Sequence, residues 1–246
     1  MRIIASDFDG TLSHNGIDDA KRATIAKWQA AGNLFGLISG RGILSLLDVV
    51  RQFDLKLDFL LANNGAGLAK PDGTILRDDR ADGSILPQLL KVLFEQDCLY
   101  AFIDGAQHLR VFPDETQAKQ QNGYTQYTVP VPRYFNQVST RHDSRSAEVT
   151  QLLRQMMGER INPLLNGACI DIVSVKMNKA QGIYTLLDYL GADKKDVITV
   201  GDQTNDLDMI AEFYSYAMQH GHPLVKQAAD FEVGDVTELI ERELLR

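Results

Sequence analysis

The stretch IIASDFDGTLSHNG, residues 3–16, places two aspartates two positions apart directly after a short apolar segment. Residues 2–6 have the composition of a buried strand, and Asp7 and Asp9 follow where this strand would end. Because side chains two apart in extended backbone point the same way, we expect both aspartates to face one site while Phe8 turns into the core. Two like charges this close repel each other and do not stabilise a fold. The pair therefore indicates a site with its own chemistry at the end of the first strand.

The segments after this strand alternate between helical and strand-like patterns. Residues 18–31 and 42–53 have the apolar spacing of helices, whereas residues 34–39 and 57–63 are strand-like. The N-terminal part of the chain thus has the order β-α-β-α-β. This order is typical of a parallel sheet with crossover helices.

A different pattern occupies the middle of the chain before the helix–strand alternation returns at residue 179. We expect hairpins around Gly73, Gly105 and Gly167, helices over 84–96 and 144–157, a strand over 134–140, and irregular structure over the polar, proline-bearing residues 113–132. The sequence therefore predicts an α/β fold: a Rossmann-like parallel-sheet core, residues 1–79 and 175–246, with an inserted α+β domain, residues 80–174.

Composition narrows the class of protein. Of the 246 residues 44% are apolar, and the formal charge is 25 − 33 = −8. This acidic balance argues against nucleic acid or an anionic membrane as partner, but not against an anionic substrate, because a bound cation reverses the local field. The N-terminus lacks the pattern of a signal peptide, and no apolar run is long enough to span a membrane, so we expect a soluble cytoplasmic protein. Cys98 and Cys169 lie far apart and are expected to be small buried residues.

Polar, glycine-bearing segments follow each strand of the predicted core. They are residues 7–11, 39–41, 63–65 and 201–206. Ligands of open α/β sheets bind at the carboxyl ends of the strands, so these segments are expected to meet. The crowded carboxylates are best relieved by a hard divalent cation with oxygen ligands, and Mg²⁺ is the natural candidate.

A cation beside carboxylates, a hydroxyl and glycine-loop N–H groups suits a phosphate. An ionised Asp7 could attack phosphorus without a base to activate it. A protonated Asp9 could give the leaving alkoxide its proton and then deprotonate the water that hydrolyses the aspartyl phosphate. Two like residues in opposite protonation states need different surroundings.

Four segments, in the expected order, resemble the motifs of the haloacid dehalogenase superfamily. They are Asp7–Thr11, Ser39 in LISGR, Lys179, and GDQTNDLDM at 201–209. The resemblance spans the whole core. The resemblance implies that the catalytic residues are Asp7 as nucleophile, Asp9 as acid/base and Lys179 for charge compensation. It implies that phosphate is bound by Ser39, Lys179 and backbone N–H groups near Gly10 and Gly40, and that Mg²⁺ is held by Asp7, Asp202 and the carbonyl of Asp9. The residues implied to support the site are Thr11, Asn205 and Asp206.

The insert lies between the second and third motifs, and its mixture of hairpins and helices resembles the Cof-type branch, in which such a cap selects the substrate. Two departures stand out. Asn63 occupies a position where the branch more often has Glu, and the third motif reads MNKAQG rather than Asn-Lys-Gly. Neither touches a core catalytic position, but Asn63 could alter the choice of substrate.

Several other polar residues have plainer interpretations. Lys176 competes with Lys179, which the motif spacing favours. Asp208 is expected on a solvated helix position, and residues 141–143 in a solvated turn. His220 and His222 are expected in a surface loop, since no Cys or Glu completes a metal-site spacing. Trp28 is expected to pack in a core or against a partner, and Arg41 could either touch phosphate or cap a helix.

These observations predict a Mg²⁺-dependent phosphatase that acts on a small phosphorylated metabolite, best a sugar phosphate, through an aspartyl phosphate on Asp7. A sugar phosphomutase or phosphotransferase on the same fold is the nearest alternative. A non-catalytic regulatory protein that binds a phosphorylated metabolite is a second alternative. We expect no nucleic-acid or membrane partner and a monomer or weak dimer.

Overall fold

The computed structural model describes all 246 residues, which fold as two compact units. The core unit comprises Met1–Arg77 and Asn178–Arg246, and the insert unit comprises Asp78–Met177. Both boundaries lie within three residues of the positions expected from the sequence, residues 79/80 and 174/175.

An eight-stranded sheet forms the centre of the core unit, with the strand order β16-β15-β14-β1-β2-β3-β4-β5. Its six parallel strands are β1 (Ile3–Ser6), β2 (Leu34–Ile38), β3 (Phe59–Ala62), β14 (Val197–Gly201), β15 (Tyr214–Met218) and β16 (Phe231–Val233). The hairpin strands β4 (Gly67–Ala69) and β5 (Ile75–Asp78) extend one edge, and β4 is antiparallel to β3. The predicted α/β class is confirmed, whereas the short strand β16 was not expected.

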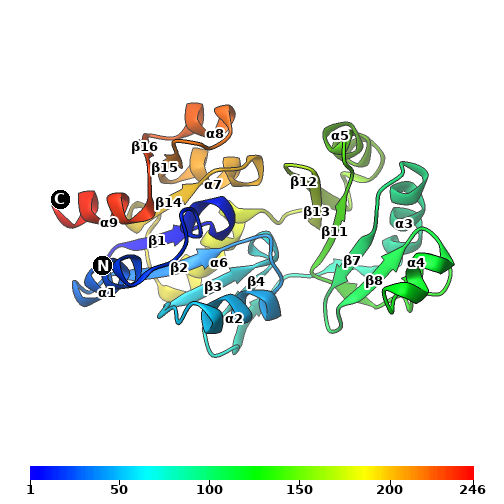
Figure 1. Cartoon of the computed structure of the whole chain (residues 1–246), viewed down its shortest axis with the longest axis horizontal. Coiled ribbons are helices and arrows are strands. Elements are labelled where there is room, and N and C mark those ends of the chain that lie inside the picture. Colours follow the sequence, from blue (N-terminus) through cyan, green and yellow to red (C-terminus); the bar gives the residue numbers. More distant parts are fainter. The chain divides into compact units, whose positions relative to one another are not determined.

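Helices cover both faces of this sheet (Figure 1). One face packs against α1 (Asp19–Ala30), α2 (Ile43–Gln52) and α9 (Val236–Leu244). The other packs against α6 (Lys179–Leu190), α7 (Leu207–Glu212) and α8 (Pro223–Ala228). Trp28 is fully buried in the first of these layers, and its indole N–H donates to the carbonyl of Leu34 at 2.8 Å, so it is a core residue.

The insert unit contains a six-stranded sheet with the order β12-β13-β11-β7-β8-β9 and a two-stranded pair β10-β6. The strands are β6 (Ala81–Asp82), β7 (Ala101–Asp104), β8 (Leu109–Phe112), β9 (Tyr124–Thr125), β10 (Tyr134–Phe135), β11 (Gln137–Arg141), β12 (Ile161–Asn166) and β13 (Cys169–Ser174). Helices α3 (Leu86–Glu95) and α5 (Ser146–Met157) bury their apolar faces in the core of this unit.

Two expectations for the insert were wrong. Residues 113–132 are not wholly irregular, because Asp114 caps α4 (Glu115–Gln120) by accepting the N–H of Gln117 at 2.9 Å. The strand expected over 134–140 is split in two at Asn136. The side-chain amide of Asn136 donates to Asp78 and to the carbonyl of Asp79, which separates β10 from β11.

The two cysteines lie wholly or partly inside the structure. Cys98 is buried and Cys169 half-buried, and burial raises the pKa of both thiols, as expected for small packed residues.

No helix has the combination of length and apolar character that crossing a bilayer requires.

Candidate active site

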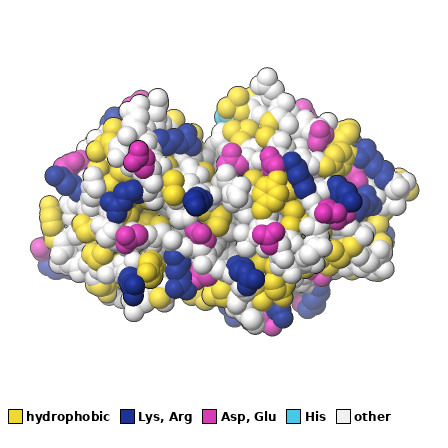
Figure 2. Space-filling model, turned by 180° about the vertical axis from the view of Figure 1, so that it is seen from behind, with side chains coloured by type: hydrophobic (Ala, Val, Ile, Leu, Met, Phe, Trp, Pro, Cys, Tyr) yellow, Lys and Arg dark blue, Asp and Glu magenta, His cyan; other side chains and the backbone are white.

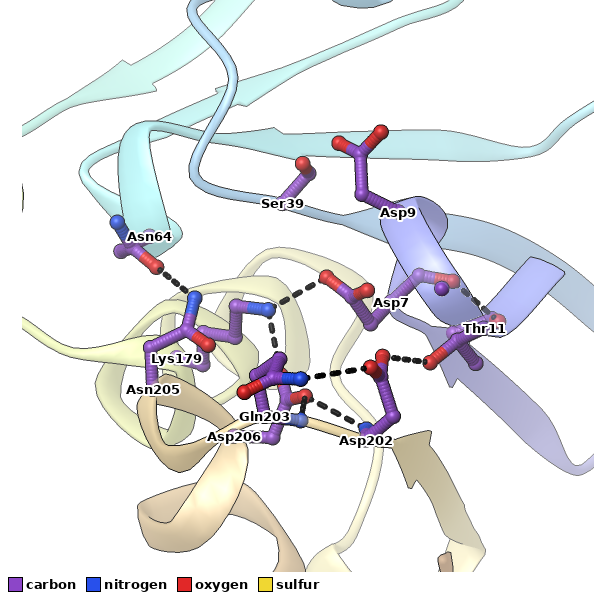
Figure 3. Close-up of polar contacts among 12 residues, drawn as sticks. Asp7, Asp9, Thr11, Ser39, Asn64, Lys179, Asp202, Gln203, Asn205 and Asp206 are labelled. Atoms are coloured by element: carbon purple, nitrogen blue, oxygen red, sulfur yellow. Dashed lines mark hydrogen bonds and ion pairs between the residues drawn. The ribbon is translucent and has the colours of Figure 1, made fainter. Parts of the chain in front are cut away.

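The polar segments that follow the core strands converge at one edge of the sheet (Figure 3). Parallel pairing of β1 with β14 and β2 brings their carboxyl ends side by side. The backbone N–H of Asp7 donates to Val200 at 2.9 Å, and that of Ser39 donates to Leu61 at 2.9 Å. Asp7, Ser39 and Asp202 therefore start from neighbouring strand ends, as the sequence predicts.

The chain does not stay extended after β1, which corrects one expectation. Phe8–Leu12 form a tight turn in which Asp9 (φ −75°, ψ 118°) and Gly10 (φ +80°, ψ −13°) have the backbone angles of a type II β-turn. A Cβ on Gly10 would lie 2.6 Å from a carboxylate oxygen of Asp202, so only glycine fits here. Phe8 is buried as predicted, but Asp9 is carried away from the other carboxylates.

Lys179 reaches the site from the first residue of α6. Asn178 caps this helix by accepting the N–H of Gln181 at 2.9 Å. The helix approaches the turn after β3 closely, because a Cβ on Gly182 would lie 2.4 Å from the Cα of Gly65. This contact uses the glycine of MNKAQG and places the Lys179 side chain in the carboxylate cluster, where it is fully buried. Lys176, by contrast, is exposed and belongs to the insert unit.

A network of short polar contacts fixes the buried residues. The Lys179 ammonium donates to Oδ1 of Asp7 at 2.6 Å and to Oδ1 of Asp206. Oδ2 of Asp206 accepts the backbone N–H groups of Asp202 at 2.9 Å and Gln203 at 3.0 Å. Thr11 donates its hydroxyl to Oδ1 of Asp202 at 2.7 Å. Asp206 is thus saturated by structural contacts, whereas Oδ2 of Asp7 accepts no hydrogen bond.

The electrostatics of this cluster are unbalanced. Three buried carboxylates and one ammonium, −3 + 1, leave two negative charges. Burial raises the pKa of Asp7 to about 8, against the opposing effect of Lys179, and burial also raises the pKa of Asp202. Burial alone would lower the pKa of Lys179, but Asp206 and Asp7 outweigh it and raise that pKa, so the ammonium stays charged. The expectation that Asp7 is ionised at neutral pH therefore requires a further cation.

The donor set fits a hard divalent cation. One oxygen from each of Asp7, Asp202 and Asp206 lies within 4.8 Å of the others. All are carboxylates, the ligands that Mg²⁺ prefers, and two positive charges would balance the cluster. Asp206 accepts three hydrogen bonds, from Lys179 and two backbone N–H groups. Oδ2 of Asp7 accepts none and Oδ2 of Asp202 accepts only a long one, from Gln203 at 3.4 Å, so these two oxygens are better placed to bind a cation.

Asp9 lies in different surroundings. Its carboxylate forms a bidentate ion pair with Arg41, at 2.6 Å to Nε and 2.7 Å to Nη2. Arg41 also donates to Ser45 at 3.2 Å and lies over the ring of Phe8. This pair raises the pKa of Arg41. Arg41 does not cap α2, whose N-cap residue is Gly42, and its pairing with Asp9 is a contact that the sequence did not predict.

The remaining predicted site residues line the same edge. Ser39 is buried and its Oγ accepts the N–H of Arg41 at 3.2 Å, with Gly40 between them. The N–H of Gly10 donates to Ser13 at 3.3 Å.

Two asparagines support the site from neighbouring loops. The amide of Asn205 donates to Oδ1 of Asn64 at 3.1 Å and ties the turn after β14 to the turn after β3. Asn63 is buried with φ +51°. The contacts of Asn64 and Gln203 were not predicted from the sequence, although both residues lie in polar segments that follow core strands.

The residues with plainer interpretations are placed as follows. Asp208 is exposed on the first turn of α7, as expected. Residues 141–143 are not wholly solvated as expected, because His142 is buried and accepts the N–H groups of Ser144 and Arg145 in the turn before α5. His220 is exposed, as expected for a surface loop, and its side chain also contacts the backbone of Gly10.

Comparisons with known proteins identify the family of the chain. The sequence profile of the haloacid dehalogenase-like hydrolases matches residues 4–238. A phosphatase of Escherichia coli K12 named for 5-amino-6-(5-phospho-D-ribitylamino)uracil is 22% identical, over 95% of this chain and 91% of its own. The HMP-PP phosphatase of Escherichia fergusonii is 22% identical, over 85% and 80%. The crystal structure of SMU.1108c from Streptococcus mutans superimposes with a TM-score of 0.85 at 20% identity, over all of both chains. The predicted family and enzyme class are confirmed: the chain belongs to the haloacid dehalogenase-like hydrolases.

Proposed function

We propose that this protein is a Mg²⁺-dependent phosphatase that hydrolyses a small phosphorylated metabolite through an aspartyl phosphate on Asp7. The observation that carries the proposal is the pairing of a buried carboxylate, which has one oxygen free, with a fully buried ammonium 2.6 Å from its other oxygen. A structural ion pair would not need two further buried carboxylates beside it, since burying charge is costly.

Asp7 acts as the nucleophile. Its Oδ2 attacks phosphorus while Lys179 holds Oδ1 and so fixes the direction of the carboxylate. A new bond forms between Oδ2 and phosphorus, and the bond to the leaving oxygen breaks. Bound at the carboxylates of Asp7 and Asp202 and at the carbonyl of Asp9, Mg²⁺ would supply the positive charge that keeps Asp7 ionised and offsets the phosphoryl oxygens.

Asp9 carries the proton in both half-reactions. It donates a proton to the leaving alkoxide, and then accepts one from the water that attacks the aspartyl phosphate, which releases inorganic phosphate and restores Asp7. In the structure Arg41 holds the carboxylate of Asp9 on the exposed side of the turn. Release of Asp9 from Arg41, with a change of side-chain rotamer and uptake of a proton from solvent, therefore precedes the first proton transfer.

The phosphoryl oxygens are assigned to Ser39, Lys179 and the N–H groups near Gly10 and Gly40. Ser39 is buried directly after β2, at the same edge of the sheet as Asp7 (Figure 3). The N–H of Gly10 would exchange its long contact with Ser13 for phosphate. Thr11, Asn205 and Asp206 keep these groups in place through the contacts described above.

We assign selection of the leaving group to the insert unit, because the core residues described so far recognise only phosphate. A sugar phosphate is the first substrate to test. Two relatives are named for other phosphorylated compounds, HMP-PP and the ribitylaminouracil phosphate, so both belong in the panel. On the face shown in Figure 2 basic and acidic side chains are interspersed, which gives no support to a nucleic-acid partner.

The test is release of inorganic phosphate from sugar phosphates, nucleotides, flavin mononucleotide, pyridoxal phosphate and the two compounds above, with Mg²⁺ and with EDTA. We expect release from at least one compound that needs Mg²⁺ and falls at least about a thousandfold in Asp7→Asn. Isomerisation of a sugar phosphate without release would favour the phosphomutase. Binding of these compounds without turnover would favour the regulator.

A further inference from the structure

The loop that follows β15, residues 219–222, has the sequence Gln-His-Gly-His and contacts both loops that carry the candidate metal ligands. It lies in the core unit, after the strand next to β14. The proposed function assigns no role to it. Its contacts are nevertheless made to the backbone of Gly10 on one side and of Asp202 on the other.

His220 holds the Gly10 side. Its Nε2 lies 2.8 Å from the carbonyl oxygen of Gly10. A carbonyl can only accept, so Nε2 must carry the proton and donate. The ring of His220 also stacks on that of His14, with centroids 3.8 Å apart and planes at 19°. Because Gly10 follows Asp9 directly, this bond fixes the turn that presents the Asp9 carbonyl and, through Thr11, the carboxylate of Asp202.

Gly221 and His222 hold the Asp202 side. The backbone N–H of His222 donates to the carbonyl of Asp202 at 2.7 Å. A Cβ on Gly221 would lie 3.1 Å from Cα of Asp202, so the loop rests directly on that residue. Asp202 is thus held at its N–H by Asp206 and at its carbonyl by His222.

The loop itself is anchored away from the site. The N–H of Gln219 donates to Val233 at 2.9 Å, and Lys226 donates to the carbonyl of Gln219 at 3.1 Å. The imidazole of His222 accepts the N–H of Leu224 at the start of α8. A loop fixed at both ends can transmit its position to what it contacts.

We propose that residues 219–222 form a clamp that sets the distance between the Gly10 turn and Asp202, and that His220 is a positioning residue for the Mg²⁺ ligands. The proposal rests on the proposed function, since it takes Mg²⁺ as the ion bound there. Loss of the His220 bond leaves every ligand in place but lets the Gly10 turn move. Loss of this bond should therefore weaken Mg²⁺ binding without removing any residue that takes part in the proposed reaction.

His220 is exposed, so one hydrogen bond of ordinary strength is at stake. We expect the Kd of Mg²⁺ to rise about fivefold when the bond is removed. The half-saturating Mg²⁺ concentration for phosphate release should rise by the same factor, while kcat at saturating Mg²⁺ stays close to that of the wild type. A defect in folding alone would not produce this division.

The experiment compares Mg²⁺ binding by calorimetry, without substrate, in the wild type and three variants. His220→Phe keeps an aromatic ring to stack on His14 but has no donor. His220→Gln restores an N–H at about the reach of Nε2. His14→Phe keeps the stack and removes no hydrogen bond of the clamp. Thermal unfolding of each metal-free variant serves as the control for folding.

Weaker binding in His220→Phe, recovered in His220→Gln and absent from His14→Phe, is the expected result. Equal affinity in His220→Phe and the wild type would overturn the clamp and leave the proposed phosphatase intact. Equal weakening in His220→Phe and His220→Gln would also overturn it, because the donor would then not matter. If the wild type binds no more Mg²⁺ than Asp202→Asn, the metal assignment of the proposed function fails together with the clamp.

Discussion

Asp7 and Asp9 are two residues apart and chemically identical, yet they lie in opposite environments. Asp7 is buried, paired with the fully buried Lys179, and surrounded by two further carboxylates. The side chain of Asp9 is 54% exposed and is held by Arg41, itself 40% exposed. The glycine-bearing turn of Phe8–Leu12 creates this difference, because it carries the second aspartate out of the cluster that the first one joins.

The contrast shows how one pair of aspartates can divide a reaction. A buried carboxylate in a fixed position is suited to attack, provided that a cation keeps it ionised. A solvent-exposed carboxylate in an ion pair that contributes little stability is suited to moving a proton between two positions. The predictions below test this division, from the largest expected effect to the smallest.

Lys179→Met should have the largest effect, because it leaves three buried carboxylates without their one counter-charge. We expect the free energy of unfolding of the metal-free protein to fall by about 3–5 kcal/mol at pH 8, and phosphate release to fall by at least about a hundredfold. Urea unfolding and initial rates measure the two. Lys176→Met is the matched control, since that lysine is exposed, and a similar loss there would remove the special status of Lys179.

Asp9→Asn should separate activity from stability. Loss of a general acid and base slows turnover by about 10²–10⁴. The free energy of unfolding should change by less than about 1 kcal/mol, because the pair with Arg41 is largely exposed. Chemical denaturation beside steady-state kinetics checks both. A destabilisation as large as that of Lys179→Met would mean that Asp9 is as structural as the buried cluster.

The pH dependence of stability should distinguish Asp7 from Asp9. Burial raises the pKa of Asp7 from its ordinary 3.8 to about 8, so the folded protein holds this proton more tightly than the unfolded chain does. The contribution of Asp7 to the free energy of unfolding therefore falls as pH rises from about 4 to about 8, by up to about 1.4 kcal/mol per pH unit.

Asp7→Asn isolates this contribution. In the metal-free protein, the free energy of unfolding of the wild type minus that of the variant should decrease steadily across this pH window. Urea unfolding at a series of pH values measures this difference. Saturating Mg²⁺ should flatten the difference, since it stabilises the ionised carboxylate. A difference that does not vary with pH in the metal-free protein would show that Asp7 is already ionised through its contact with Lys179.

The sequence predicts the core of this arrangement well because local patterns encode it. Apolar strands that each end in a glycine-bearing polar segment can meet only at one edge of a parallel sheet. Asp7, Ser39 and Asp202 are therefore brought together as expected, and Lys179 is distinguished from Lys176 by its place at the start of a helix.

The sequence does not predict contacts that depend on turn geometry or on residues distant in the chain. The turn that begins at Phe8 carries Asp9 out of the cluster, and nothing in the pattern of residues 7–11 specifies its backbone angles. His220 and Gly10 are 210 positions apart, so their bond exists only in the folded chain. In the insert, a single side chain, Asn136, splits what reads as one continuous strand.

Arg41→Lys should have the smallest effect and tests whether Arg41 only holds Asp9. Lysine keeps the charge but lacks the planar fork that makes two parallel hydrogen bonds. Because Asp9 must leave this pair before it transfers a proton, we expect phosphate release to stay within about tenfold of the wild type and the free energy of unfolding to fall by less than about 1 kcal/mol. Ser45→Ala, which removes only the contact that orients Arg41, should change neither quantity by more than Arg41→Lys does. A loss of activity as large as that of Asp9→Asn would instead place Arg41 on the phosphate, the alternative that its position after Ser39 and Gly40 suggests.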